Sequence, residues 1–326
     1  MNKKILVTGG SGFIPSHLVR RLVKMGSDVY VTVKYNSIID NIRISDVWDK
    51  VSIVEADLRN IDSLEQIKTI KPEIIIHMAA YNHVGDSFIH PNEAMNSNSL
   101  GTVNLLESYQ DYEQFIYTST SEVYGYQDSV PFKENMKPSP ISPYSIGKYS
   151  GELYARMKSD HQNKPITILR PFNAFGPYQS NRAIISEIIT KCLNGNKIET
   201  TSGEQTREFN YVSNLVDGFI AAIEQRGKSV GKTINLGGGE EIKIKDLVLL
   251  IHDLTESKSE LNIGKLDHRP TEIWRMYTDA NIAREDLNWA PKINFKEGLV
   301  RTIKWHKEFL SVFGKSGDLV KICDMA

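Results

Sequence analysis

Tyr144 and Lys148 are the residues whose types and spacing most directly indicate chemistry in this chain of 326 residues. They stand four positions apart in Pro143-Tyr-Ser-Ile-Gly-Lys148, so on a helix they share one face and the ammonium lies beside the phenol. A free tyrosine titrates near pH 10, and a neighbouring cation lowers that pKa toward neutrality. The pair is a candidate general base, although the same spacing also occurs on ordinary surface helices.

A hydroxyl cluster precedes this pair and strengthens the catalytic interpretation. The run Thr118-Ser-Thr-Ser-Glu122 directly follows the apolar segment 114–118, which we predict to be a strand. A glycine turn lies far upstream, so three independent pieces stand in the order expected of an active site.

The glycine turn connects a predicted strand, Lys4–Thr8, to an amphipathic helix that begins near Phe13 and Ile14. Gly9 and Gly12 remove side chains where the backbone must approach a pyrophosphate, and the free amides of the helix start face that anion. Pro15 stands where a third small residue is expected. Because a proline in the first helical turn sacrifices no hydrogen bond, we expect a slightly displaced helix start and an intact site.

The choice between NAD and NADP stays open at this stage. A second predicted strand, 28–33, is followed by Lys34, Asn36 and Ser37 and by no acid at the usual place. An acid there would accept from the ribose 2′-hydroxyl, whereas Lys34, Asn36 and Ser37 are able to take a 2′-phosphate. Lys34 is equally well explained as a solvated surface lysine.

Further strands alternate with helices. Strands at 51–55 and 74–80 and helices at 61–71 and 93–109 are predicted, the last of which carries Asn98. This alternation predicts an α/β fold with a doubly wound, Rossmann-like parallel sheet covered on both faces. Ligands of such sheets lie off the carboxyl ends of the strands, which assigns the adenine and ribose sites to Asp57, Leu58, Ala79 and Ala80.

Composition excludes several other classes of function. The net charge is −1 with dispersed Lys and Arg, so no basic surface for nucleic acid is expected. The apolar run before the glycines is too short for a signal-peptide core or a membrane span. Cys192 and Cys323 are far apart and lack ligand-spaced neighbours, so neither a disulfide framework nor a metal site is expected, and the cytoplasm is the natural compartment.

Taken together, the motifs resemble those of the extended short-chain dehydrogenase/reductases that act on nucleotide sugars. The resemblance covers nearly the whole chain through Thr8-Gly-Gly-x-Gly-Phe-Ile14, His77-x-Ala-Ala80, His83-Val-Gly-Asp-Ser87, Asn98-x-x-Gly-Thr102, Ser119-Thr-Ser-Glu-Val-Tyr-Gly125, Tyr144-x-x-x-Lys148, Arg170-Pro-Phe-Asn-x-Phe-Gly-Pro177 and Thr206-Arg-Glu-Phe-x-Tyr-Val212. It implies that Thr120 hydrogen-bonds the sugar 4-hydroxyl, that Tyr144 takes its proton, and that Lys148 also holds ribose hydroxyls. It further implies a tightly bound NAD or NADP, contacted also by Asn98, that takes hydride from C4.

The second half of the chain is expected to bind the diphosphate of a nucleotide sugar. Asn173, Arg207 and Arg269 fall where the family holds that group, although either arginine is also explicable as a surface charge. We predict a dinucleotide-binding domain over 1–172, rejoined by 212–239 and 288–310, with the remainder of 173–326 forming the substrate domain.

Glu122 bears on which reaction follows C4 oxidation. A C4 ketone acidifies the hydrogen at C5, and a carboxylate beside the sugar is able to remove it. Within the resemblance, Glu at this position is typical of 4,6-dehydratases and glucuronate decarboxylases. A Ser before it, such as Ser121, is typical of GDP-mannose-type dehydratases, and we expect Ser121 to contact the substrate. The segment Asn173–Ile185 most resembles dehydratases of N-acetylhexosamine nucleotides in bacterial surface-glycan biosynthesis.

The leading interpretation is therefore a 4,6-dehydratase on a UDP- or GDP-linked hexosamine or N-acetylhexosamine. The alternatives are a C4 or C5 epimerase, a UDP-glucuronate decarboxylase, and a cofactor-sensing module without catalysis. A homodimer is expected, because helices 93–109 and 144–158 carry apolar residues such as Leu105, Leu153 and Met157 on faces that a monomer would expose.

Overall fold

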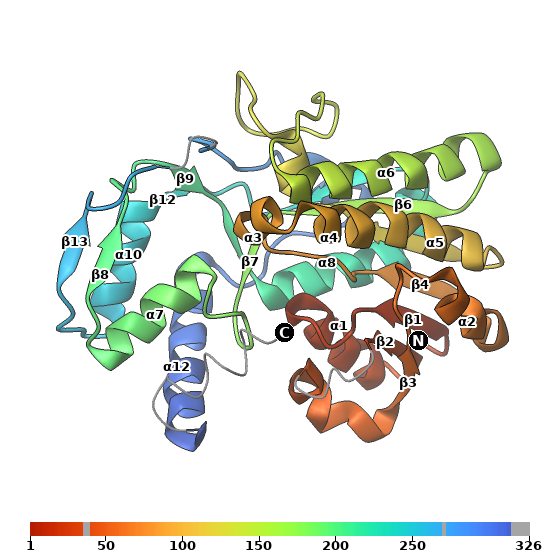
Figure 1. Cartoon of the computed structure of the whole chain (residues 1–326), viewed down its shortest axis with the longest axis horizontal. Helices are drawn as coiled ribbons and strands as arrows, with labels where there is room; N and C mark the ends of the chain where they lie inside the picture. The colour runs from red at the N-terminus through yellow and green to blue at the C-terminus, as the bar shows by residue number, and fades with distance from the viewer. Residues whose placement is uncertain (35–39, 269–271, 314–326) are drawn as a thin grey trace.

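A parallel sheet forms the centre of the molecule, flanked by helices, with a smaller lobe at one side (Figure 1). The computed structural model describes residues 1–34, 40–268 and 272–313. Within these residues the sheet has seven strands in the order β11-β6-β5-β4-β1-β2-β3, and every neighbouring pair is parallel. The predicted Rossmann-like class is confirmed.

The five strands predicted from the first 118 residues are present, and the fourth of them ends at His77. Their bounds are β1 Lys4–Thr8, β2 Asp28–Val33, β3 Val51–Glu55, β4 Ile74–His77, β5 Gln114–Thr118, β6 Ile166–Pro171 and β11 Thr233–Leu236. Successive side chains of β1 enter different cores, since Ile5 and Val7 belong to one buried cluster and Leu6 to another. Apolar residues on both faces of a strand require helices on both sides.

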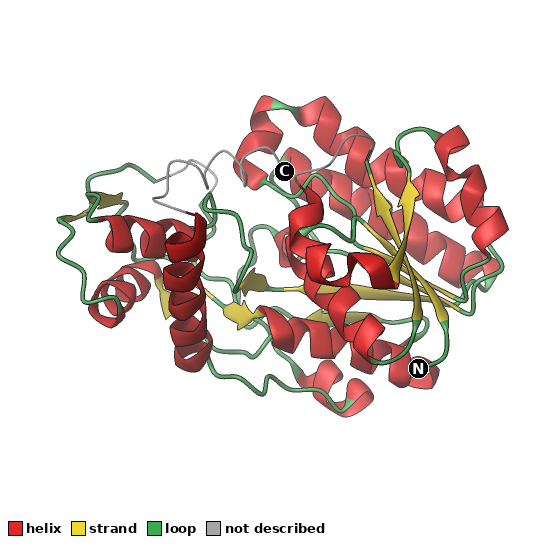
Figure 2. Cartoon of the chain, turned by 90° about the horizontal axis from the view of Figure 1, so that it is seen from below, coloured by secondary structure: helices red, strands yellow, loops and turns green. Residues whose placement is uncertain are grey.

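Two helical layers supply that cover (Figure 2). One face packs against α1 Phe13–Lys24, α8 Val212–Glu224 and α11 Asn281–Leu287, and the other against α2 Glu65–Ile70, α5 Gly101–Ser108 and α6 Pro143–Gln162. Shorter helices are α3 Val84–Ile89, α4 Pro91–Met95 and α9 Arg226–Ser229, with 3-10 turns at Asp40–Lys50, Ile61–Leu64 and Ser121–Tyr124. Among the described residues no helix is long and apolar enough to cross a membrane.

The predicted helix 93–109 is interrupted. A π turn over Asn96–Leu100 separates α4 from α5 and carries Asn98. The wider turn inserts a residue into the helical repeat, so the face of α5 is rotated relative to a regular continuation of α4. Leu105 is consequently fully buried in the core beneath the sheet, and the expectation that it lies on an outer face is wrong.

The smaller lobe has its own core around Phe175, Ile188, Leu247 and Ile251. Its elements are β7 Asn173–Phe175, α7 Ile184–Asn194, β8 Ile198–Thr200, β9 Thr206–Arg207, β10 Phe209–Tyr211, β12 Ile242–Lys243, α10 Ile244–Leu254, β13 Leu261–Ile263 and α12 Phe295–Phe313. Its strands pair two by two, as β10-β7, β12-β9 and β13-β8.

The C-terminal segment 288–310 contributes to the cores of both the large sheet and the smaller lobe. Trp289 joins the core of the large sheet, whereas Leu299 and Ile303 of α12 join the core of the smaller lobe. The assignment of 288–310 as a whole to the first domain is therefore not supported for α12, which packs against α7 and β10. The rest of the predicted domain division stays a prediction.

A buried ion pair fixes α6 to the sheet. Glu152, which is fully buried, accepts from Ser119 Oγ at 2.6 Å and from Arg170 Nη2 at 2.5 Å. Arg156 Nη2 adds a contact at 3.0 Å. Burial opposes ionisation of Glu152, but the hydrogen bonds and charge of Arg170 outweigh it and lower the carboxyl pKa. One side chain of α6 thus binds the ends of β5 and β6.

Close contact at Gly151, the residue before Glu152, also holds α6 in place. A Cβ added to Gly151 would lie 2.6 Å from Tyr117 Oη and 2.8 Å from the carbonyl oxygen of Asn98. No ordinary side-chain atom fits at such distances, so only glycine lets α6 approach the π turn and β5 this closely.

Gly151→Ala should lower the free energy of unfolding by about 1–3 kcal/mol, because the added methyl group forces α6 away from its neighbours. Thermal unfolding followed by circular dichroism measures the effect. Gly227→Ala is the matched control, since nothing lies within 4 Å of a Cβ at that helical glycine. Equal unfolding midpoints for the two variants would contradict the close approach.

Glu152→Gln should lower the free energy of unfolding by about 3–5 kcal/mol, because it leaves Arg170 buried without a compensating charge. Glu187→Gln, which removes an exposed pair with Lys191, should cost less than about 1 kcal/mol. Because the folded-state pKa of Glu152 is lowered, the stability that its charge contributes is present at neutral pH and is lost as pH falls through that lowered value. Urea unfolding at pH 7 and in acid should show the gap between wild type and Glu152→Gln narrowing in acid.

Candidate active site

Tyr144 and Lys148 lie one turn apart on α6, as their spacing predicts. The helix begins at Pro143 behind a capping box in which Ser142 accepts from the Ser145 amide at 3.1 Å. Burial raises the pKa of Tyr144 to about 12, the nearby charge of Glu122 adds to the rise, and a hydrogen bond with Thr120 opposes it. The phenol is thus protonated in the ligand-free protein and depends on added positive charge to act as a base.

Lys148 is 2% exposed and lies beneath Tyr144 on the same helix face. Its Nζ lies 4.6 Å from the centre of the Tyr117 ring, and Tyr117 Oη donates to the Lys148 carbonyl oxygen at 2.7 Å. Burial lowers the pKa of Lys148 to about 7, and the carboxylate of Glu152 works against that fall. The ammonium is therefore held rigidly in a place where a further charge strongly affects its protonation.

Thr120 and Glu122 follow β5 on the 3-10 turn Ser121–Tyr124. Thr120 caps this turn by accepting from the Glu122 amide at 3.3 Å. The turn brings the Thr120 hydroxyl and the half-buried Glu122 carboxylate toward Tyr144, since both act on its pKa. Three of the predicted catalytic groups therefore meet at the start of α6.

Ser121 is oriented differently from its neighbours. Its Oγ donates to Met276 Sδ at 3.5 Å, and the residue is 2% exposed. Contact with a sugar would require this hydroxyl to leave Met276, so the predicted substrate contact of Ser121 stays a prediction.

The glycine turn has the geometry that a phosphate cradle needs. Gly9 has φ +64°, and a Cβ there would lie 2.8 Å from the Ala79 Cα. Gly12 is the N-cap of α1 and provides no side-chain acceptor, so the first amides, at Phe13 and Ile14, remain available to an anion. Pro15 is accommodated in the first turn of a regular α1, and the predicted displacement of the helix start stays a prediction.

Two polar side chains, Thr8 and Asn98, hold the end of β4 and the loop that follows it. Thr8 Oγ1 accepts from the Ala79 amide at 3.1 Å and contacts His77 Nδ1 at 2.8 Å. Asn98 from the π turn binds the backbone of Tyr81, accepting from its amide at 2.8 Å and donating to its carbonyl at 3.0 Å. Asn98 thus shapes the loop that begins with Ala79 and Ala80.

The ends of β2 and β3 carry charged residues. Asp57 is bound by Arg59, whose guanidinium lowers the carboxyl pKa, and Leu58 is 8% exposed. Lys34 Nζ lies 3.7 Å from Glu93 Oε1. Asn36 and Ser37 lie outside the described residues.

The predicted diphosphate residues divide into two groups. Asn173 lies on β7, which pairs with β10, and its Nδ2 donates to the Glu208 carbonyl at 3.0 Å. Arg207 lies on β9, which pairs with β12. Arg207 contacts Glu272 Oε1 at 2.5 Å and the Ile273 carbonyl at 2.6 Å. A diphosphate would have to replace these partners, and Arg269 lies outside the described residues.

Sequence reasoning missed several residues of this region, notably Glu152, Arg59 and Glu93. Glu152 continues the four-residue spacing of Tyr144 and Lys148, a signal that was available in the sequence. Arg59 and Glu93 are 34 positions apart and meet only in the folded chain, with Arg59 Nη1 2.5 Å from Glu93 Oε2.

Comparison with known proteins places these features in a family. The family model described as GDP-mannose 4,6 dehydratase matches residues 6–302. The chain is 34% identical over 313 residues to a putative UDP-glucose 4-epimerase of Methanocaldococcus jannaschii, covering 93% of this chain and 98% of that protein. It is 31% identical over 321 residues to the dTDP-D-glucose 4,6-dehydratase of Bos taurus, covering 94% of this chain and 89% of the other.

A solved structure agrees with the sequence comparisons. The crystal structure of the dTDP-glucose 4,6-dehydratase DesIV of Streptomyces venezuelae, with NAD bound, superposes with a TM-score of 0.87 at 27% identity. The match covers 94% of this chain and 98% of that one. With the glycine turn, the Tyr144–Lys148 helix and these matches together, the chain belongs to the extended short-chain dehydrogenase/reductase family of nucleotide-sugar dehydratases and epimerases.

Proposed function

We propose that this protein is a nucleotide-sugar 4,6-dehydratase that acts on a UDP- or GDP-linked hexosamine or N-acetylhexosamine in bacterial surface-glycan biosynthesis. The observation that carries the proposal is the carboxylate of Glu122 on the turn that Thr120 caps, near enough to Tyr144 for its charge to raise the pKa of that phenol. Oxidation at C4 needs only Tyr144, Lys148 and Thr120, whereas a carboxylate at this place serves a later proton transfer at C5.

Tightly bound NAD is the cofactor that fits best. The positive φ of Gly9, its approach to Ala79 and the uncapped start of α1 form a cradle for a pyrophosphate. NAD in DesIV supports the same cofactor here. When bound, it supplies the acceptor for hydride from C4 and returns that hydride later, so release within a turnover has no advantage.

Tyr144 removes the proton of the 4-hydroxyl in the first step. Its pKa of about 12 must fall, and the positive charges of protonated Lys148 and of the nicotinamide act in that direction. Thr120, already a hydrogen-bond partner of Tyr144, orients the same hydroxyl. The phenol therefore becomes a base only when the cofactor is in place.

Glu122 removes the C5 proton once C4 is a ketone, the C5–C6 double bond forms, and the C6 hydroxyl leaves as water after taking a proton from a donor. The hydride held by bound NAD would then return to C6, and Glu122 would return its proton to C5. The group that protonates the leaving C6 hydroxyl is not assigned, because the Ser121 hydroxyl donates to Met276 Sδ. A C4 epimerase is the second candidate, favoured by the name of the M. jannaschii relative. It would use Tyr144 in the same way but would have no step at C5.

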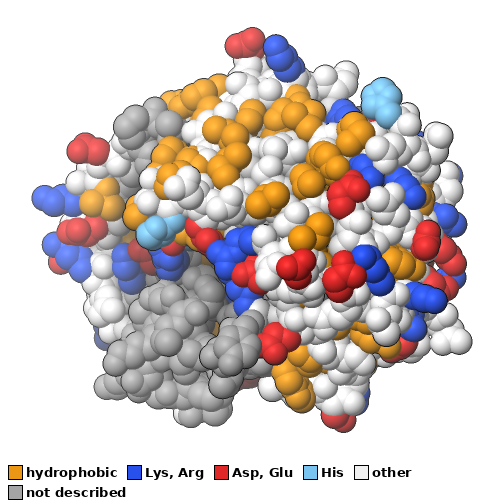
Figure 3. All heavy atoms as spheres, turned by 45° about the vertical axis from the view of Figure 1, so that its right-hand side comes forward, with side chains coloured by type: hydrophobic (Ala, Val, Ile, Leu, Met, Phe, Trp, Pro, Cys, Tyr) orange, Lys and Arg blue, Asp and Glu red, His pale blue; other side chains and the backbone are white. Residues whose placement is uncertain are grey.

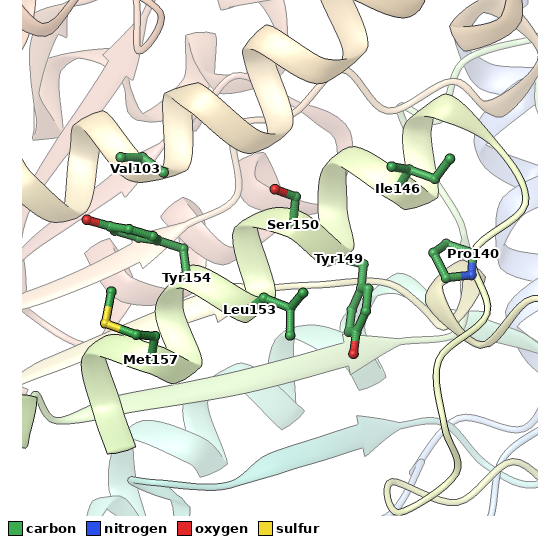
Figure 4. A pocket seen from close by; sticks show the side chains of 8 residues that line it. All are labelled: Val103, Pro140, Ile146, Tyr149, Ser150, Leu153, Tyr154 and Met157. Carbon is green, nitrogen blue, oxygen red and sulfur yellow. The ribbon is translucent and has the colours of Figure 1, made fainter. Parts of the chain in front are cut away.

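We also propose a homodimer built on α5 and α6. A groove of about 450 Å³ runs along α6, lined from that helix by Ile146, Tyr149, Ser150, Leu153, Tyr154 and Met157, from α5 by Val103, and by Pro140 (Figure 4). Ile146 is 45% and Leu153 48% exposed. Figure 3, which turns the side bearing α5 and α6 toward the viewer, shows hydrophobic side chains gathered in the upper half of this face. A second copy of the same helices would cover them.

Mass spectrometry of the products in D₂O, with a panel of UDP-, GDP-, dTDP- and CDP-sugars, tests the reaction directly. A 4,6-dehydratase gives a product lighter by one water, and a C5 epimerase gives one of unchanged formula with deuterium at C5. A C4 epimerase changes neither mass nor deuterium content, and chromatography separates its product. Absence of turnover across the panel would overturn the proposed activity.

Tyr144→Phe and Glu122→Gln should separate the two steps. Tyr144→Phe removes the base for C4 oxidation, so cofactor reduction and product formation should both fall by roughly 10²–10⁴-fold. Glu122→Gln keeps shape and hydrogen bonding but takes up no proton, so it should still reduce the cofactor, seen as nicotinamide absorbance, while water loss and C5 exchange stop. Full turnover by Glu122→Gln would favour C4 epimerisation.

Leu153→Glu should convert the dimer to monomer, because it places two charges in the apolar contact. Light scattering at micromolar concentration measures the mass. Leu249→Glu on α10, at a site with 42% exposure, is the matched control and should leave the mass unchanged. A wild-type monomer would refute this assembly.

A further inference from the structure

Four charged side chains meet where β2 and β3 end, and they come from three separate stretches of the chain. Lys34 follows β2, Asp57 and Arg59 follow β3, and Glu93 belongs to α4. Arg59 Nε donates to Asp57 Oδ1 at 2.9 Å, and its Nη1 donates to Glu93 Oε2 at 2.5 Å. The other oxygen of Glu93 lies 3.7 Å from Lys34 Nζ.

This edge of the sheet is where a Rossmann fold distinguishes its two cofactors. An acid after the second strand accepts from the ribose 2′-hydroxyl of NAD, and a cation there accommodates the 2′-phosphate of NADP. The chain has Val33-Lys34 in place of that acid. By sequence alone, Lys34 and Arg59 make the edge positive.

Glu93 offsets the positive charge of Lys34 and Arg59. It contacts both cations, and Asp57 contacts Arg59 as well, so two positive groups face two negative ones. A 2′-phosphate would have to draw Lys34 and Arg59 away from Glu93 and then lie beside its carboxylate. Repulsion between like charges at such short range opposes this binding.

We infer that Glu93 is the residue that makes this site select NAD over NADP, by providing from α4 the negative charge that is missing after β2. The inference rests on the dinucleotide binding in the proposed function and goes beyond it, since it assigns cofactor choice to a residue outside the β2 turn. Glu93 acts on the two cations and on the 2′ position and takes no part in the sugar chemistry.

Competition for the cofactor tests the assignment without any sugar substrate. The purified protein is incubated with equimolar NAD⁺ and NADP⁺, freed of unbound nucleotide and denatured, and the released dinucleotides are quantified by liquid chromatography. Wild type should release mainly NAD. Glu93→Gln should raise the bound NADP-to-NAD ratio by roughly tenfold or more, because Lys34 and Arg59 are then able to bind the phosphate.

Two further variants make the result specific. Glu113→Gln removes an exposed carboxylate that pairs with Lys3 at 2.8 Å next to the start of β5, and it should leave the ratio unchanged. In the double variant Glu93→Gln/Arg59→Gln, the bound NADP-to-NAD ratio should return to the wild-type value. An unchanged ratio in Glu93→Gln, or an equal rise in Glu113→Gln, would overturn the inference. Dinucleotide selection by a protein that converts no sugar would instead count against the proposed reaction alone.

Discussion

The buried carboxylate of Glu152 is the constraint on which the geometry of the active site depends. A buried ion pair is stabilising only when its geometry is nearly fixed, because the desolvation penalty offsets most of the Coulomb attraction between the two charges. Glu152 meets this condition through Ser119, which directly follows β5, and Arg170 of β6, and Arg156 of its own helix adds a third contact. Movement of α6 along the sheet would break several of these contacts together, so Tyr144 and Lys148 are held in register with the turn that carries Thr120 and Glu122.

The proposed diphosphate-binding residues, in contrast, are held by contacts that can be exchanged. Arg207 is partnered by Glu272 and by backbone carbonyls, contacts that an entering anion is able to replace. The proposed reacting groups are therefore fixed before substrate arrives, while the proposed diphosphate contacts would form by exchange. Fixed catalytic groups together with exchangeable substrate contacts suit an enzyme that must keep its proton-transfer geometry and still release a large charged product.

Sequence reasoning was strongest where a local pattern carries the information. Apolar runs located the sheet strands, and the four-residue spacing placed Tyr144 and Lys148 on one helix face. It failed at Leu105, because a regular helical period takes no account of the π turn at Asn96–Leu100. It also missed the pairing of Glu93 with Arg59 and Lys34, since a contact between separate stretches of chain exists only after the sheet has formed.

The position of β11 at the edge of the sheet matters while the chain is still being synthesised. β11 pairs only with β6, yet the whole of β7 to β10 and the helices α7 to α9 lie between them in the sequence. On the ribosome, the outer edge of β6 consequently has no strand partner until residue 236 has emerged. An unpaired strand edge is open to pairing with other chains, so the growing polypeptide passes through a stage at which chaperones have a surface to protect.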